Sequence, residues 1–410
     1  MIRLLAFLAL AFCSLAADWP RFRGPDGLGT SAEDLPAKWT NETLRFDVKL
    51  PGEGNGSPIV AGGKVYLQTS SRDGTSRGLV CLDAGTGKLV WEQNLVGATA
   101  HTHKKNSLAS STPACDGERV YAVFWDGDGV ALHAYSLDGK PLWNRKLGGF
   151  ISQHGPGFSP MTINGKVIVN YDQDNAASII AFDGKTGQEV WKAKRNAFRA
   201  CYSTPYARVV DGKAEVVISS TAGLTGYDPD TGDVRWNWNW PFDGMALRTV
   251  GGPIQVGSMV VAISGDGGGS RSVVVVDASA RQPKMVWEKK KDSPYVPMPV
   301  ARGETLFWMT DAGIAMALDL KTGHEKYKER ALSGSVSASL VMVNCGGREP
   351  AIVAISEAGK AIVYKAKADG FDKIADNDLK APVIATPAVS DGKIYIRAGD
   401  RLICHGKRGA

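Results

Sequence analysis

The stretch Asp83-Ala84-Gly85-Thr86-Gly87-Lys88-Leu89-Val90-Trp91 decides the fold of this chain because it recurs. An Asp, a Thr-Gly pair and an aromatic residue at the same spacing return at 183–191, 228–236 and 319–327, the last ending in Tyr327. An Asp side chain can bond the backbone two residues on, and Gly takes the left-handed conformation that a hairpin with a bulge requires. Each copy therefore predicts a tight hairpin followed by a strand that carries a large aromatic side chain.

A second feature repeats along the chain: a Pro, usually after a small residue, that leads into an alternating strand. It falls at Pro58, Pro113, Pro160, Pro205, Pro253, Pro299 and Pro387, with Leu340 at the place of an eighth Pro. The seven steps average 47 residues, and four short alternating strands fit into each. A repeat of this length is typical of propellers. The sequence predicts an all-β, eight-bladed β-propeller with four antiparallel strands per blade.

The two ends of the chain indicate how the ring closes. The last repeat, 383–406, supplies only three strands, whereas residues 44–50 have the pattern of a closing strand with Phe46 in the Trp position. Pairing the two would remove an open sheet edge. We also predict that five tryptophans dock each blade onto its neighbour as structural wedges: Trp91, Trp143, Trp191, Trp236 and Trp287.

Composition agrees with this architecture. The chain has 410 residues, of which 43% are hydrophobic and 22% charged, as in globular proteins. Its 48 Gly and 20 Pro favour many turns over a helical bundle. A net charge of +6 is too mild for a nucleic-acid binder. Because a propeller adds blades around one axis, we expect residues 17–410 to form a single, monomeric domain.

The N-terminus has the features of a signal peptide. Leu4–Phe12 is an apolar run too short to span a bilayer, and small residues end it at Ala16, so residues 1–16 are predicted to be removed on export. Cys13 raises the alternative of a lipid anchor, which the bulky Phe12 before it disfavours. We therefore expect a periplasmic or extracellular protein without a transmembrane segment.

The remaining cysteines indicate neither a disulfide scaffold nor a metal site. Their number is odd and none forms a Cys-x-x-Cys pair, so we expect each to be a buried, unreactive residue: Cys81, Cys115, Cys201, Cys345 and Cys404.

The Asp-x-x-Thr-Gly-x-x-x-Trp repeats resemble those of the pyrroloquinoline quinone (PQQ) propellers, a family that includes the quinoprotein alcohol dehydrogenases and the BamB-type outer-membrane assembly factors. The Gly-His and Trp-Asp signature of WD-repeat propellers is not repeated. Four further stretches resemble exported PQQ-like propellers abundant in planctomycetes and related bacteria: 18–27, 105–113, 154–160 and 202–205.

The resemblance implies two functional hypotheses. Quinoprotein dehydrogenases hold PQQ on the propeller axis with Ca²⁺, a catalytic Asp and often a vicinal cysteine pair. This chain has no Cys-Cys, little inserted sequence to cover a cofactor, and no Asp, Glu and Asn set that matches the family's ligands. We therefore expect a non-catalytic cell-envelope binding or scaffold protein without a cofactor or catalytic residues. The alternative is a PQQ-dependent alcohol or sugar dehydrogenase with PQQ and Ca²⁺ in the central funnel.

Candidate ligand-binding residues lie mainly in the segments just before the Pro positions, which should line one mouth of the central funnel. Histidines and cations converge there, which suits a small polar or anionic ligand or an envelope protein. The alternative is that these groups bond buried loop carbonyls and water. Together with Trp125, which has no repeat role, the candidates are His101, His103, Lys105, Asn106, His154, Arg199, Tyr202 and Arg248.

Overall fold

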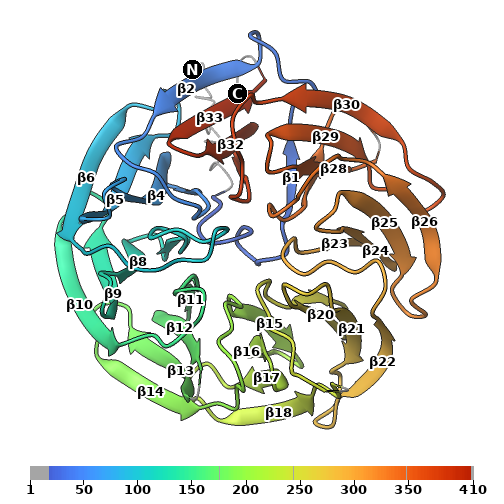
Figure 1. Cartoon of the computed structure of the whole chain (residues 1–410), viewed down its shortest axis with the longest axis horizontal. Coiled ribbons are helices and arrows are strands. Elements are labelled where there is room, and N and C mark those ends of the chain that lie inside the picture. Colours follow the sequence, from blue (N-terminus) through green and yellow to red (C-terminus); the bar gives the residue numbers. More distant parts are fainter. Residues whose placement is uncertain (1–17, 175, 243, 348, 408–410) are drawn as a thin grey trace, which may run out of the picture.

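A computed structural model describes residues 18–174, 176–242, 244–347 and 349–407 of the chain. The predicted signal peptide and Cys13 lie outside these residues. Within them the chain forms 33 strands and no helix that could cross a bilayer. Figure 1 shows the strands arranged as a ring of eight blades around a central axis. This confirms the predicted eight-bladed propeller.

Six blades are four-stranded antiparallel sheets built from consecutive strands. Short alternating segments separated by glycine-rich turns produce this order, because each hairpin returns the chain beside the strand it has just left. In blades 1 to 3 the strands are β3 (Ile59–Ala61), β4 (Lys64–Ser70), β5 (Ser76–Asp83) and β6 (Leu89–Val96); β7 (Ala114–Cys115), β8 (Arg119–Trp125), β9 (Val130–Ser136) and β10 (Pro141–Gly148); and β11 (Met161–Ile163), β12 (Lys166–Gln173), β13 (Ala176–Asp183) and β14 (Glu189–Lys194). In blades 4 to 6 they are β15 (Tyr206–Val210), β16 (Lys213–Ser220), β17 (Gly223–Tyr227) and β18 (Val234–Asn239); β19 (Ile254–Val256), β20 (Met259–Gly265), β21 (Arg271–Asp277) and β22 (Lys284–Lys289); and β23 (Val300–Arg302), β24 (Thr305–Met309), β25 (Ile314–Asp319) and β26 (Glu325–Arg330).

Blade 8 closes the ring as the sequence predicts. It holds β31 (Ala388–Ser390), β32 (Lys393–Ala398) and β33 (Arg401–Gly406), and β2 (Leu44–Lys49) adds the outer strand antiparallel to β33. Phe46 lies opposite Cys404 and is 7% exposed. A Cβ on Gly87 in blade 1 would come within 2.6 Å of the Phe46 ring, so Phe46 packs on the next blade in the place of a Trp.

Blade 7 differs from the prediction by one strand. To β27 (Val341–Asn344), β28 (Ala351–Ile355), β29 (Lys360–Lys365) and β30 (Lys373–Asp378) it adds β1 (Thr30–Asp34), which runs parallel to β27 at the inner edge of the sheet. Four of the five residues of β1 are polar, and they do not alternate with apolar residues, so no strand signal marks it in the sequence. It pairs there because it carries the chain from the centre of the ring toward the rim (Figure 1).

Four of the five tryptophans named above lie between blades. Each indole Nε1 donates to a backbone carbonyl at the start of the hairpin between the third and fourth strands of the next blade, at 2.7–3.0 Å. The glycine of that hairpin lies against the indole, where a Cβ would be 2.5–2.9 Å from ring atoms. The pairs are Trp91 with Leu137 and Gly139, Trp143 with Gly184 and Gly187, Trp191 with Pro229 and Gly232, and Trp287 with Leu320 and Gly323.

Trp236 departs from the predicted docking. It is buried against blade 5, but its Nε1 has no partner among the described residues. The next hairpin begins Asp277-Ala278, without the glycine, and Arg208 donates to the Ala278 carbonyl at 3.0 Å instead. The equivalent carbonyls of two other blades receive the Arg302 guanidinium and the Tyr395 hydroxyl. The backbone carbonyl at the start of this hairpin thus accepts a hydrogen bond in each of these blades, while the side chain that donates to it differs.

Candidate functional site

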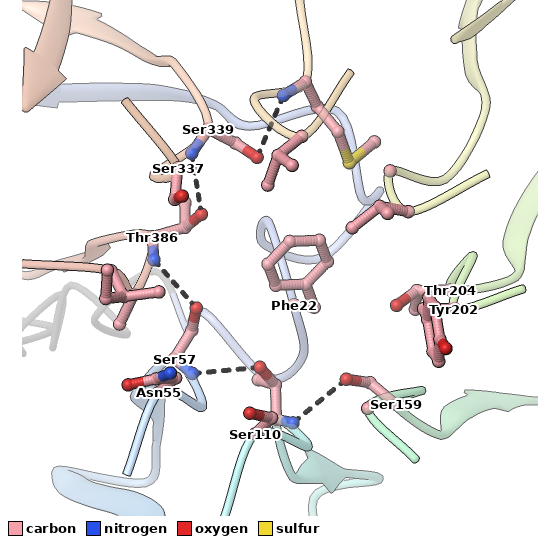
Figure 2. Close-up of a pocket in the computed structure, with 18 residues that line it drawn as sticks. Phe22, Asn55, Ser57, Ser110, Ser159, Tyr202, Thr204, Ser337, Ser339 and Thr386 are labelled. Carbon is pink, nitrogen blue, oxygen red and sulfur yellow. Dashed lines mark hydrogen bonds between the residues drawn. The ribbon is translucent and has the colours of Figure 1, made fainter. Parts of the chain in front are cut away.

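The axis of the propeller holds a cavity of about 120 Å³ lined by residues of every blade. Its wall has two layers, because residues at the Pro-preceding position and those two residues earlier both face inward (Figure 2). Ser, Thr, Asn and Tyr side chains form most of the wall. Apolar groups of blades 5, 6 and 8 complete it: Val250, Val296, Met298 and Ile384.

Five hydrogen bonds join the layer at the Pro-preceding position across six blades. The backbone N–H before each Pro position donates to the hydroxyl at the same position of the next blade, at 2.9–3.1 Å. The series runs from Met298 through Ser339, Thr386, Ser57 and Thr112 to Ser159, and so crosses the point where the ring closes (Figure 2). Among the described residues none of these hydroxyls donates to a protein acceptor, so their O–H groups remain available to a molecule on the axis.

Phe22 lies in the middle of this ring (Figure 2). The segment that carries it is fixed at its start by Trp19, which is 2% exposed and forms a β-bridge with Val60. Pro20 follows, and its carbonyl accepts the N–H of Cys115 in blade 2. The aromatic ring therefore plugs the axial channel.

Two buried arginines hold the plug on either side of Phe22. Arg21 donates to the Pro205 carbonyl of blade 4, and Arg23 to the carbonyls of Met298, Pro299 and Leu340 in blades 6 and 7, at 2.7–3.4 Å. Burial lowers the pKa of Arg21 to about 10 and that of Arg23 to about 9, so both remain charged at neutral pH. Gly29 leaves room for Arg23, because a Cβ there would lie 2.6 Å from its guanidinium.

Four of the predicted site residues come together at the mouth above the cavity. The rings of His103 and His154 lie 4.9 Å apart, and His154 is 6.3 Å from Tyr202. Asn106 donates to the carbonyls of His154 and Pro156, so its amide fixes the turn that carries this histidine. Burial, together with the charges of Arg248, His103 and Arg199, lowers the pKa of His154 to about 4. It is therefore neutral at neutral pH.

The other candidates are spread around the same face. Lys105 pairs with Glu357 of blade 7 at 2.7 Å, and Arg199 donates to the Ala246 carbonyl. His101 is exposed, and Trp125 packs against Gly155, where a Cβ would be 3.0 Å from its ring. Arg248 is buried at the start of blade 5, 3.8 Å from Asp174. Asn106 and Arg199 thus bond loop carbonyls, as the alternative interpretation expects.

Only Tyr202 of the nine candidates lines the axial cavity itself. The sequence analysis did not identify Phe22, Arg21 and Arg23, because these residues lie outside the repeats and have no counterparts in them. It also did not identify the hydroxyl ring, which is the series of hydrogen-bonded Ser and Thr hydroxyls around the axis. The recurring Ser or Thr before Pro was the signal that could have predicted it.

The family of the chain follows from comparison with known proteins. A family model described as "Outer membrane protein assembly factor BamB" matches residues 31–134 and 75–329. The chain belongs to this BamB family of PQQ-like propellers. BamB of Burkholderia pseudomallei (strain K96243) is 25% identical over 408 residues, which cover 95% of each chain. Methanol dehydrogenase subunit 1 of Methylobacterium organophilum is 25% identical over 188 residues, 40% of this chain but 26% of the dehydrogenase.

Solved structures agree on the fold of this BamB-family chain. BamB from Moraxella catarrhalis superposes with a TM-score of 0.64 at 16% identity, covering 90% of this chain and 98% of that one. Quinohemoprotein alcohol dehydrogenase from Comamonas testosteroni gives 0.67 at 14% identity, covering 95% and 80%. The resemblance to both branches of the PQQ-like propellers is thereby confirmed at the level of fold.

The axial cavity of this BamB-family chain does not fit the quinone of the dehydrogenase branch. Small-molecule sites usually enclose about 300–1,000 Å³, whereas Phe22 leaves about 120 Å³. The hydroxyl-lined wall offers no carboxylate to a Ca²⁺ ion, and the described residues hold no group of three His, Cys, Asp or Glu side chains that could bind a metal.

Proposed function

We propose that this chain is a non-catalytic binding or scaffold protein of the cell envelope. The Phe22 plug carries the proposal, because the chain's own aromatic ring occupies the place where the dehydrogenase hypothesis requires a cofactor. The family supports it, since the BamB relatives are named as outer-membrane protein assembly factors. Their role at the envelope is extended here to this chain.

We assign the binding surface to the face that bears the mouth of the funnel. Three consecutive blade connections place exposed apolar side chains there: Ile151 is 63% exposed, Phe198 67% and Met245 73%. Arg199 links two of these connections, because its guanidinium contacts Met245. Apolar groups beside cations and aromatic rings are the composition that protein interfaces favour. An envelope protein is the partner that this surface suits best.

Site-specific photo-crosslinking in the envelope of the source cell tests this assignment. A photoreactive residue at Ile151 should give a discrete adduct with an envelope protein. The matched control is Val190, an apolar residue of blade 3 that is 45% exposed on the outer strand β14 and faces the rim. Adducts of equal yield from both positions, or from neither, would contradict a binding surface at the mouth.

A further inference from the structure

Arg248 differs from every other buried arginine in the described part of the chain. Six others are at most 5% exposed, and each makes at least two hydrogen bonds to carbonyl, carboxylate or hydroxyl oxygens: Arg21, Arg23, Arg77, Arg195, Arg208 and Arg397. The Arg248 side chain is 6% exposed, its Nε is buried without a partner, and its guanidinium has no hydrogen bond among the described residues. A buried charge normally needs such partners because its desolvation is costly.

Among the described residues, the one carboxylate that pairs with Arg248 only partly compensates its charge. Asp174 lies 3.8 Å away, beyond hydrogen-bond range, and its Oδ1 already accepts the N–H of Ala200 at 2.7 Å. Arg195, by contrast, makes a bidentate pair with Asp172 and also bonds the Tyr227 hydroxyl. The chain can satisfy a buried arginine fully, and at position 248 it does not.

A β-bridge fixes the backbone of Arg248. Arg248 and Gly265 exchange two backbone hydrogen bonds of 2.9 Å. Gly265 leaves room for Tyr295, because a Cβ there would be 2.7 Å from the Tyr295 ring. The backbone of Arg248 is therefore fixed by a bridge to blade 5, while its side chain has no acceptor among the described residues.

Two buried tyrosines lie within electrostatic range of the guanidinium. Burial raises the pKa of both Tyr202 and Tyr295 to about 12, and in each the nearby Arg248 charge opposes that rise. His154, on which the same charge acts, has a buried Nδ1 without a partner. Two buried nitrogens without a hydrogen-bond partner, Arg248 Nε and His154 Nδ1, thus lie near Tyr202 on two different blade connections.

The unpaired guanidinium and the charged groups around His154 favour an anionic ligand. Arg248, Arg199 and Asp174 act on His154, which is itself neutral at neutral pH, and together these three groups leave one positive charge. A planar guanidinium pairs best with a planar, two-oxygen anion. We propose that Arg248 anchors a binding site for the carboxylate group of a small organic monoanion at the mouth of the funnel. The inference rests on the proposed binding function only in placing the site on the binding face.

Titration with acetate at constant ionic strength, followed by saturation-transfer NMR of the acetate methyl group, tests the site. Acetate should bind the wild-type protein saturably. Arg248→Gln should weaken it by about 10- to 100-fold, the value of a charge-assisted hydrogen bond. The matched control Arg145→Gln removes the same charge from β10 on the rim and should change the affinity less than about twofold. Equal weakening by both variants, or no saturable binding by the wild type, would overturn the proposal.

Two further measurements distinguish a ligand anchor from a structural arginine. Arg248→Gln should melt at or above the wild-type temperature, because it removes an unsatisfied buried charge; a fall as large as that of Arg195→Gln, or failure to fold, would show that Arg248 is kept for Asp174. Inorganic phosphate should compete more weakly than acetate, and tighter phosphate binding would overturn the carboxylate assignment. If acetate does not bind but Ile151 still gives crosslinks, the Arg248 site is refuted and the proposed function stands. If acetate binds but Ile151 gives no crosslinks, the Arg248 site stands without a protein partner.

Discussion

The junctions between blades at the outer edge of the propeller (the rim) use repeated contacts, whereas the residues around its axis (the hub) make contacts that are not repeated. At the rim, a hairpin glycine packs against an aromatic side chain of the neighbouring blade at five junctions, and Trp191 with Gly232 is one of them. At the hub, the side chains with a proposed function are not repeated: Phe22 plugs the axis, and the Arg248 guanidinium lies near the mouth without a hydrogen bond among the described residues. Between the two regions runs the ring of hydroxyl groups, which joins six blades through five hydrogen bonds and is interrupted at blades 4 and 5.

This difference separates stability from function. A repeated contact can be replaced at one junction without loss of the ring, as Arg208 shows where it takes the carbonyl that a tryptophan serves elsewhere. A unique contact has no such substitute. We therefore expect rim substitutions to change the free energy of unfolding, and hub substitutions to change binding with little effect on folding.

The largest effect is expected from opening the ring. Deleting residues 40–50 removes β2, exposes the edge of β33 and takes Phe46 from its place on Gly87. The whole domain should lose its cooperative thermal transition, because both blade 8 and its junction with blade 1 are lost. Phe46→Ala alone should cost about 3–5 kcal/mol, the usual range for a buried Phe. A truncated protein with unchanged melting behaviour would refute the closure.

A smaller effect is expected at a single rim junction. Trp191→Ala removes an indole that is 8% exposed and its bond to the Pro229 carbonyl, and should lower the free energy of unfolding in urea by about 3–5 kcal/mol. Trp125→Ala, at the mouth and half-buried, is the control from the hub side and should cost clearly less. A greater cost for Trp125 than for Trp191 would break the division between rim and hub.

The smallest effect is expected from pH. Burial lowers the pKa of His405 to about 4, against an ordinary value near 6.5; His405 lies on β33, the strand next to the outer strand β2 of blade 8. The unfolded chain takes up its proton as pH falls through 6.5, and the folded chain does so only near 4. Stability contributed by the neutral imidazole is therefore present above pH 6.5 and lost as pH falls from 6.5 to 4.

Urea unfolding at pH 7 and pH 4.5 checks this dependence. His405→Gln should flatten the loss between the two pH values. His154→Gln should flatten it in the same direction, because burial also lowers the pKa of His154 to about 4. A variant at 405 with the full wild-type loss would show that this histidine is not the source.

The sequence predicts the rim far better than the hub. Eight strand starts, the Asp-to-Trp hairpins and Phe46 all follow from periodicity, which survives because each junction repeats the same local contacts. The position of the Phe22 plug does not follow from periodicity. Its flanking arginines bond Pro205 and Leu340, which lie 184 and 317 residues away along the chain, so these contacts form only in the closed ring. The strand β1 was missed for the same reason: its partner β27 lies seven blades later and its own residues do not alternate.

The mouth is an intermediate case. The repeat places His154, Tyr202 and Arg248 on one face, and this could be predicted from their positions before the Pro residues. Which of them bond loop carbonyls and which stay unpaired depends on side-chain geometry that no spacing encodes, as Asn106 and Arg248 illustrate.

Titration with PQQ and Ca²⁺ tests the central claim most directly. Tryptophan quenching would report binding, and dye reduction with an alcohol or an aldose would report turnover, in the wild type and in Phe22→Ala. We predict no stoichiometric binding and no dye reduction by the wild-type protein, because Phe22 occupies the axis. One-to-one binding with turnover by the wild type would contradict the account and identify the chain as a quinoprotein dehydrogenase.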